Sequence, residues 1–117
     1  MNFTDTSDQE ILEIAEPIIF NIIEGSNDLN YEKFSRDFSE EMSNAVPEEE
    51  LLRQMKEAHP VTGLVEQRRV FIHCIRRNTG VTVLWVGYNE KIEGEVLVNL
   101  TLDEKDGAIK VFGASVG

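Results

Sequence analysis

The spacing of apolar residues changes near the middle of this 117-residue chain, from a helical period to a strand-like one. Up to about residue 58, apolar side chains recur every three or four positions, which gives a helix one buried side. From Gly63 onward, four short apolar runs alternate with turn residues, the pattern of short strands. A chain of this length holds one hydrophobic core. The sequence therefore predicts a single α+β domain at 1–117, with a helical layer at 7–58 and a sheet at 63–116.

The first predicted helix has a clear start. Overlapping capping boxes at Thr6–Gln9 and Ser7–Glu10 each place a hydroxyl three residues before a long polar side chain that can bond back. Pro17 interrupts the apolar stripe and deletes one backbone donor, so we expect a bend there. Gly25 is the expected end of this helix, because glycine commonly follows the last helical turn.

Two further helices are expected before the sheet. Asp28 or Asn30 caps the second helix. Its aromatic side chains fall on one side, predicted to face the core: Tyr31, Phe34 and Phe38. The third helix begins at Pro47 with three glutamates at 48–50, which favour the positive end of a helix dipole. His59 and Pro60 are expected to close it.

The four apolar runs predict an antiparallel sheet with short connections. Asn78-Thr79-Gly80 and Asp106-Gly107 indicate hairpins, because Asn, Asp and Gly tolerate the backbone angles of tight turns. A third hairpin is expected between Asn89 and Gly94. If the last hairpin has a two- or four-residue loop, one face takes a consistently apolar set, which is the better core: Val96, Val98, Leu100, Leu102, Ile109 and Val111.

The first two strands are apolar on both faces. In the first of them, one alternating set is Val70, Ile72 and Cys74, and the other is Phe71, His73 and Ile75. A half-solvated antiparallel sheet alternates apolar with polar residues instead. We therefore expect the helices to cover one face and a second copy of the chain to cover the other, as a homodimer through the sheet. The alternative is that the long third connection folds over that face.

The surplus negative charge lies in the helical half. Residues 1–58 hold fifteen Asp or Glu against four Lys or Arg, and residues 59–117 hold seven against seven, which gives a net charge of −11. Nucleic acid and anionic membranes are disfavoured as partners, because phosphate binding needs clustered cations. The N-terminal residues do not resemble a secretory signal, and no apolar run approaches the roughly 20 residues that span a bilayer. A cytoplasmic location is expected.

His73 is the polar side chain best suited to chemistry, because histidine titrates near neutrality. No carboxylate in the sequence is placed to orient it, which favours a packing role. A three-residue turn at 78–80 would set His73 directly across from Trp85, whereas a two-residue turn would put the two side chains on opposite faces.

The remaining polar groups favour structural roles. The arginine pairs at 68–69 and 76–77 could bind an anion, but pairing with helix carboxylates or a place at the edge of the dimer contact is favoured. The glutamates at 48–50 splay around a helix, so no metal site is predicted. The single cysteine, Cys74, fits a small core residue and a reducing compartment. No cofactor motif occurs.

An acidic three-helix segment followed by a four-stranded antiparallel sheet resembles the nuclear transport factor 2-like superfamily. Within it, the segment IIEGSNDLNYEKFSRDFSEEMSNAVPEEELLRQM followed by Gly63 looks like the small prokaryotic domains grouped as domain of unknown function 3887. The likeness covers residues 8–114. It implies three N-terminal helices on one face of a curved, cone-like sheet that wraps round a pocket, frequent homodimers, and functions from isomerases and dehydratases to noncatalytic binding modules.

Two functional hypotheses follow. The first is a nonenzymatic homodimer that binds a small apolar ligand or a protein partner between the aromatic helix and the sheet. Its expected lining is Tyr31, Phe34, Phe38, His73 and Trp85. The second is an enzyme of isomerase, dehydratase or cyclase type that uses His73 for proton transfer in a solvent-reached cavity. Enzymes of the superfamily place a carboxylate on a strand that lines the cone. The central strands here hold none, which favours the first hypothesis.

Overall fold

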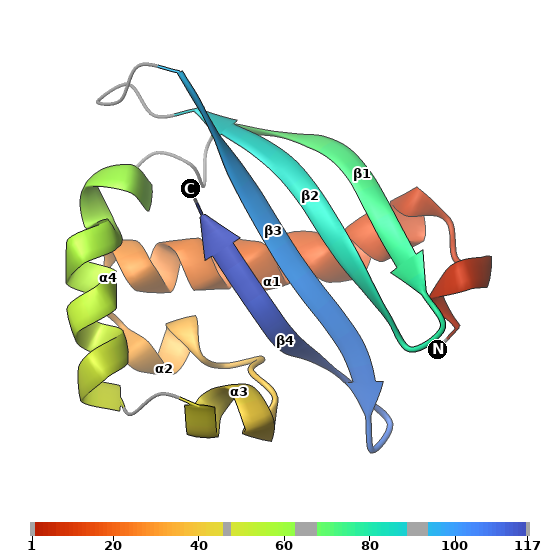
Figure 1. Ribbon diagram of the computed structural model, residues 1–117, viewed down its shortest axis with the longest axis horizontal. Coiled ribbons are helices and arrows are strands. Elements are labelled where there is room, and N and C mark those ends of the chain that lie inside the picture. The colour runs from red at the N-terminus through yellow and green to blue at the C-terminus, as the bar shows by residue number, and fades with distance from the viewer. Residues whose placement is uncertain (1, 46–47, 63–67, 89–93, 117) are drawn as a thin grey trace.

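The computed structural model describes residues 2–45, 48–62, 68–88 and 94–116 and shows an α+β fold (Figure 1). Its helices are η1 (Phe3–Asp5), α1 (Asp8–Asn27), α2 (Tyr31–Phe34), α3 (Glu40–Ala45) and α4 (Glu48–Thr62). Its strands are β1 (Arg69–Arg77), β2 (Gly80–Tyr88), β3 (Glu95–Lys105) and β4 (Ala108–Val116). No helix among these residues is long and apolar enough to cross a membrane.

The strands form one antiparallel sheet in the order β1-β2-β3-β4, as predicted. Arg77 pairs with Gly80 across a two-residue turn, and Lys105 pairs with Ala108 across Asp106-Gly107. Asp106 has a φ of 53° and Gly107 a φ of 83°, the positive angles that this type of turn requires. The third predicted hairpin falls largely on residues 89–93, which lie outside the described residues.

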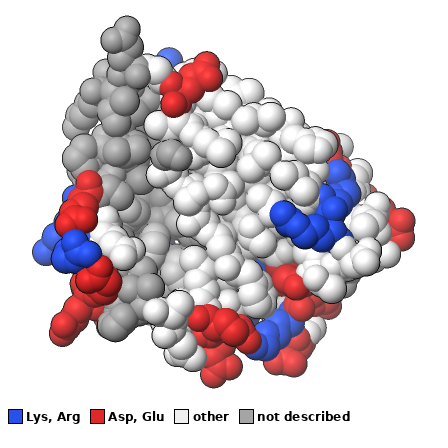
Figure 2. All heavy atoms as spheres, viewed as in Figure 1, with Lys and Arg blue, Asp and Glu red and all other residues white. Residues whose placement is uncertain are grey.

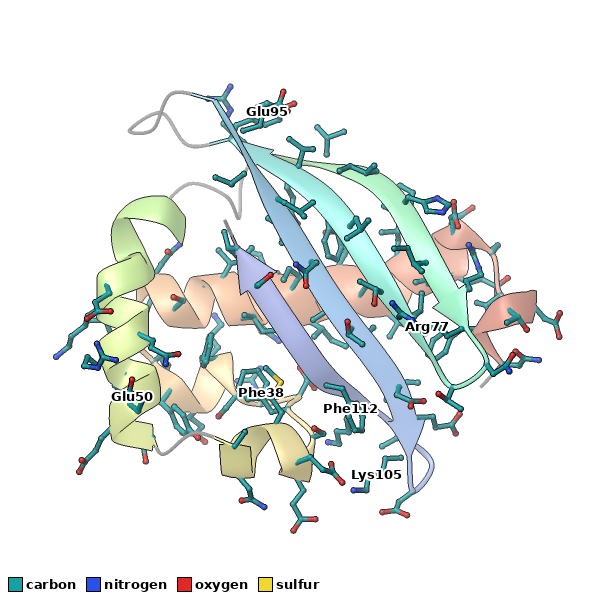
Figure 3. All side chains as sticks on the ribbon, viewed as in Figure 1. Phe38, Glu50, Arg77, Glu95, Lys105 and Phe112 are labelled. Atoms are coloured by element: carbon teal, nitrogen blue, oxygen red, sulfur yellow. The ribbon has the colours of Figure 1, made fainter. Side chains whose placement is uncertain are left out.

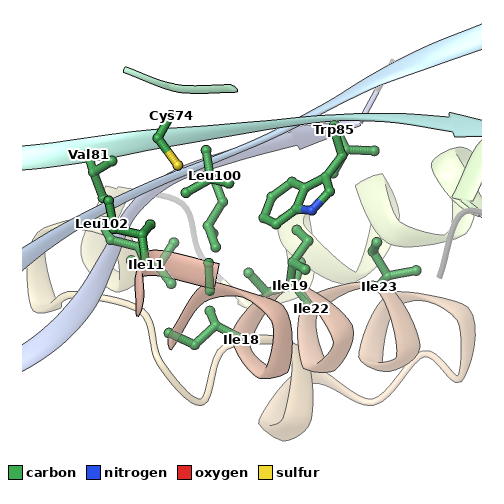
Figure 4. Packing of buried hydrophobic residues seen from close by; sticks show 14 of the residues in the cluster. Ile11, Ile18, Ile19, Ile22, Ile23, Cys74, Val81, Trp85, Leu100 and Leu102 are labelled. Carbon is green, nitrogen blue, oxygen red and sulfur yellow. The ribbon is translucent and has the colours of Figure 1, made fainter. Parts of the chain in front are cut away.

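The core lies between α1 and one face of the sheet, which we name the core face. Figure 1 shows α1 crossing behind the strands, and Figure 4 shows Ile11, Ile19 and Ile23 on the side of α1 that faces the sheet. The face predicted for β3 and β4 is confirmed, because four of its members are completely buried: Val98, Leu100, Leu102 and Val111. Ile11, Ile19 and Ile23 of α1 pack against them in one cluster.

Helix α1 starts as predicted but continues past its expected end. The Ser7 hydroxyl accepts a hydrogen bond from the Glu10 amide, as the N-cap of a capping box does, and it also donates one to the Glu10 carboxylate. The helix is continuous through Pro17 and runs through Gly25 to Asn27. Gly25 is instead a point of close packing, because an added Cβ would lie 2.5 Å from the Phe34 amide nitrogen.

The single second helix predicted around Tyr31, Phe34 and Phe38 is wrong. Helix α2 ends at Phe34, and Phe38 forms an isolated parallel bridge with Val111 of β4 before α3 begins. The Ser39 amide donates to the Val111 carbonyl (2.8 Å), and the Val111 amide donates to the Asp37 carbonyl (2.7 Å). The Asp37 carbonyl and the Ser39 amide therefore bond to the edge of the sheet, and they cannot make the hydrogen bonds of a helix that would run through them.

Two predicted boundaries also differ. Helix α4 continues to Thr62 instead of closing at His59 and Pro60, since the fixed φ of proline is itself close to helical. Strand β1 begins at Arg69, and residues 63–67 of the predicted sheet lie outside the described residues.

Candidate functional site

The sheet face turned away from α1, which we name the open face, exposes large apolar side chains. These are Val70 (56% exposed), Ile72 (48%), Ile75, Leu97 (44%) and Phe112. Half-buried Leu84 and Val86 of the central strand β2 lie among them, since Val70 pairs with Val86 and Val86 with Leu97. Figure 2 shows this face with uncharged atoms over the strands and charged side chains mostly around the rim. An apolar patch of this kind on a protein surface usually marks an interaction site.

Polar side chains of the open face bond mainly to one another. The Thr82 and Thr101 hydroxyls lie 2.9 Å apart, and Arg77 donates to the Thr82 hydroxyl over 2.8 Å. The Asn99 amide also donates to the Ser115 hydroxyl. Because these groups already have partners within the chain, another apolar surface can cover much of this region without leaving them unsatisfied.

The strand alternation places few ionisable residues on the open face. Arg77 of β1 and Glu95 of β3 lie at opposite ends of the sheet (Figure 3), and Asp103 pairs in register with Lys110. Lys105, at the end of β3, forms an ion pair with Glu41 of α3. That contact lowers the pKa of the Glu41 carboxyl and raises the pKa of the Lys105 ammonium. The open face is thus close to charge balance, unlike the helical layer.

Both edge strands of the sheet carry a bulge. In β1 the register shifts at Ile72, between Phe71 and His73, and in β4 it shifts between Val111 and Gly113. Bulges twist an edge strand and interrupt its row of backbone donors and acceptors, which opposes edge-to-edge pairing with another sheet. Segment 37–39 additionally occupies part of the β4 edge. The open face, more than either edge, is therefore suited to association.

The aromatic residues predicted to line a pocket take part in packing. The Phe34 and Phe38 rings meet edge to face with centroids 5.1 Å apart, and Phe38 is buried. Tyr31 and Phe34 are half-buried in α2. Trp85 is completely buried on the core face and belongs to the same core cluster as Phe38. The ligand-binding role of these four residues stays a prediction.

Glu16, which the sequence analysis did not identify as a site residue, forms a hydrogen bond with Trp85. Glu16 of α1 accepts from the Trp85 indole nitrogen (2.9 Å) and forms an ion pair with Arg69 (2.5 Å). The sequence held a signal for this residue, because Glu16 interrupts the apolar row that Leu12, Ile19 and Ile23 form at helical spacing. A charged residue in such a row indicates a buried partner. Here that contact ties α1 to β1 and β2.

His73 does not join the other four predicted residues. The two-residue turn at Asn78-Thr79 puts His73 opposite Leu84, on the face away from Trp85. Its side chain is exposed and makes no hydrogen bond to any residue that the structure describes. The geometry around it therefore supplies no second polar group of the kind that the proton-transfer hypothesis requires.

The other polar groups mostly have structural partners. The preference for helix carboxylates is confirmed for two arginines, because Arg69 pairs with Glu16 and Arg76 with Asp8. Arg53 joins Glu50 to Glu57 along α4. No three His, Cys, Asp or Glu residues in the described ranges come together as metal ligands would. A hollow of about 230 Å³ beside the β3–β4 turn is lined by residues that include Ser39, Glu40, Lys105 and Lys110.

No protein-family model matches this chain, and no curated protein matches it with significant sequence similarity.

Proposed function

We propose that this chain is a nonenzymatic interaction domain that forms a homodimer, with the open face of one copy packed on the open face of the other. The proposal includes the arrangement of the nuclear transport factor 2-like superfamily, in which helices cover one face of a curved, cone-like sheet. The observation that carries it is the group of five large apolar side chains exposed on one sheet face: Val70, Ile72, Ile75, Leu97 and Phe112.

The size of the open face suits a second copy. Four strands of about nine residues, with the usual spacing of about 4.8 Å and rise of about 3.3 Å, cover roughly 600 Å² in projection. Two such faces bury about 1,200 Å² in total, which is the lower end of specific interfaces. Face-to-face packing of sheets through interdigitated side chains is also a common way to build a protein core.

The charge distribution also favours a second copy. Two chains that each carry a net charge of −11 repel through their acidic helical layers, whereas their open faces are nearly balanced. A twofold axis across the strands sets the Arg77 end of one copy against the Glu95 end of the other. The Arg77 end also carries Asp103 and Lys110, so each rim of the contact brings together charges of both signs.

Sedimentation velocity between 1 and 100 µM at pH 7.5 tests the proposal. We expect a species of twice the 13.3 kDa chain mass. Leu97→Glu, which places an unpaired charge in the contact, should weaken the dimer by at least about 100-fold. The control is Phe20→Glu in α1, because Phe20 is 43% exposed but lies on the helical layer.

The two variants change the net charge equally and start from matched exposure, so the position of the substitution is the main difference between them. Circular dichroism establishes that both remain folded. A wild-type chain that is monomeric at 100 µM, or a Leu97→Glu variant that dimerises as tightly as Phe20→Glu, would contradict the proposed function.

A further inference from the structure

We propose that His73 makes the contact between two open faces sensitive to pH, so that the dimer holds while the imidazole is neutral and weakens when it is protonated. This inference rests on the homodimer proposed above and concerns the regulation of the same face.

His73 lies inside the apolar patch. It follows the bulged residue Ile72, pairs with Leu84 and lies on the same face as Ile75, two residues further along β1. Ile72 and Ile75 are among the exposed apolar side chains of the open face. A second copy that covers these neighbours also covers the imidazole. His73 makes no hydrogen bond to a described residue, so no residue in the described part of its own chain offsets the loss of water.

The charged groups around His73 on this face lie at the ends of strands. Strand β1 carries Arg77, four residues away, and β2 carries no Asp, Glu, Lys or Arg. Strand β3 carries Glu95 near one end and Asp103 and Lys105 near the other, and β4 carries Lys110. Arg68, just before β1, lies over the ring of Tyr88 in β2. Element η1, which contacts β1, carries Asp5. None of these carboxylates forms an ion pair with His73, so an imidazolium buried there would lack a partner of opposite charge.

The direction in which acid changes the dissociation constant distinguishes protonation of His73 from the change in net charge of the whole chain. Histidine in model peptides titrates near pH 6.5, so the range from pH 7.5 to 5.5 crosses the region in which an imidazole gains a proton. If the dimer accepts only the neutral form, each tenfold loss of that form in both chains raises the dissociation constant about 100-fold. Acidification also brings the chain closer to its pI of about 4.5, which reduces repulsion and acts in the opposite direction.

The experiment measures the dissociation constant of the full chain by sedimentation equilibrium at pH 7.5, 6.5 and 5.5. His73→Gln keeps a polar side chain that does not titrate in this range. His59→Gln, which changes the other histidine of the chain, in α4, is the control. We expect the dissociation constant to rise strongly with acid in the wild type and in His59→Gln, and to stay constant or fall in His73→Gln.

Calorimetry at pH 6.5 in two buffers of different ionisation enthalpy supplies a second readout, in which association should release protons from the wild type but not from His73→Gln. A dimer that tightens with acid, or whose pH response survives in His73→Gln, overturns this inference and leaves the homodimer in place. A chain that is monomeric at pH 7.5 overturns the homodimer itself, and the two failures are therefore distinguishable.

Discussion

At the scale of single residues, close approach decides the role of Gly25. The residue is buried in α1, and an added Cβ would lie 2.5 Å from the amide nitrogen and 2.8 Å from the Cα of Phe34. Its carbonyl also accepts a hydrogen bond from the Asn30 amide over 2.7 Å. The glycine therefore allows α2 to fold back against α1. Because α2 packs there, its residue Phe34 lies against the core.

Gly25→Ala is expected to destabilise the chain, although alanine is the better helix former by about 1 kcal/mol. The methyl group meets backbone atoms that cannot move without shifting α2, so overpacking should lower the free energy of unfolding by about 1–3 kcal/mol. Urea denaturation followed by the fluorescence of Trp85 measures this change. The control is Gly113→Ala, whose Cβ would lie 3.7 Å from Thr101 Cβ, an ordinary contact. Equal stability of the two variants would disprove the close-packing role.

At the scale of elements, the periodicity of the sequence predicted the features that depend only on neighbouring residues. The four strands, the Asp106-Gly107 turn and the buried face of β3 and β4 follow from alternation and turn chemistry. The face that carries His73 does not, because it depends on the length of the turn between β1 and β2, and the turn composition allows either length. A shift of one residue in a strand moves a side chain to the other face. The sequence left the face of His73 open, and the predicted pocket placed this residue on the same face as Trp85.

The region 31–45 was mispredicted because a backbone contact with a distant strand overrides helical spacing. The aromatic residues of this region do fall at helical intervals, but the amide of Ser39 bonds to Val111, 72 positions later in the chain. One local signal was available. Ser39 followed by Glu40 and Glu41 is a good helix start, and in the structure its hydroxyl accepts a hydrogen bond from the Met42 amide over 3.1 Å.

Ser39→Ala should therefore lower the free energy of unfolding by about 1 kcal/mol, the usual cost of losing an N-terminal cap. Ser43→Ala is the matched control, since Ser43 lies within α3, where alanine is favourable. Urea denaturation of both variants gives the comparison. Hydrogen exchange adds the position of the effect, because the amides at the start of α3 should lose protection while those of β2 keep it. A Ser39→Ala variant as stable as Ser43→Ala would show that the cap contributes nothing.

At the scale of the whole molecule, charge and apolar surface are separated between two layers. The acids gather on the helical side, and the open face of the sheet carries exposed apolar side chains with nearly balanced charge. Like charge over the helices favours contacts through the face that lacks it. The separation therefore limits how two copies approach each other. Electrostatic repulsion between them is smallest when they meet through their apolar faces.

This separation predicts the response of the proposed dimer to salt. Repulsion between two chains of net charge −11 acts over the Debye length, which falls from roughly 14 Å at 50 mM to about 4 Å at 500 mM ionic strength. Burial of apolar surface is not weakened by screening. The dissociation constant, measured by sedimentation equilibrium at pH 7.5, should therefore fall by several-fold when NaCl is raised over that range. A contact that depended on ion pairs between an acidic and a basic surface would weaken instead, because salt screens attraction as it screens repulsion. An increase in the dissociation constant with salt would thus place the contact away from the open face.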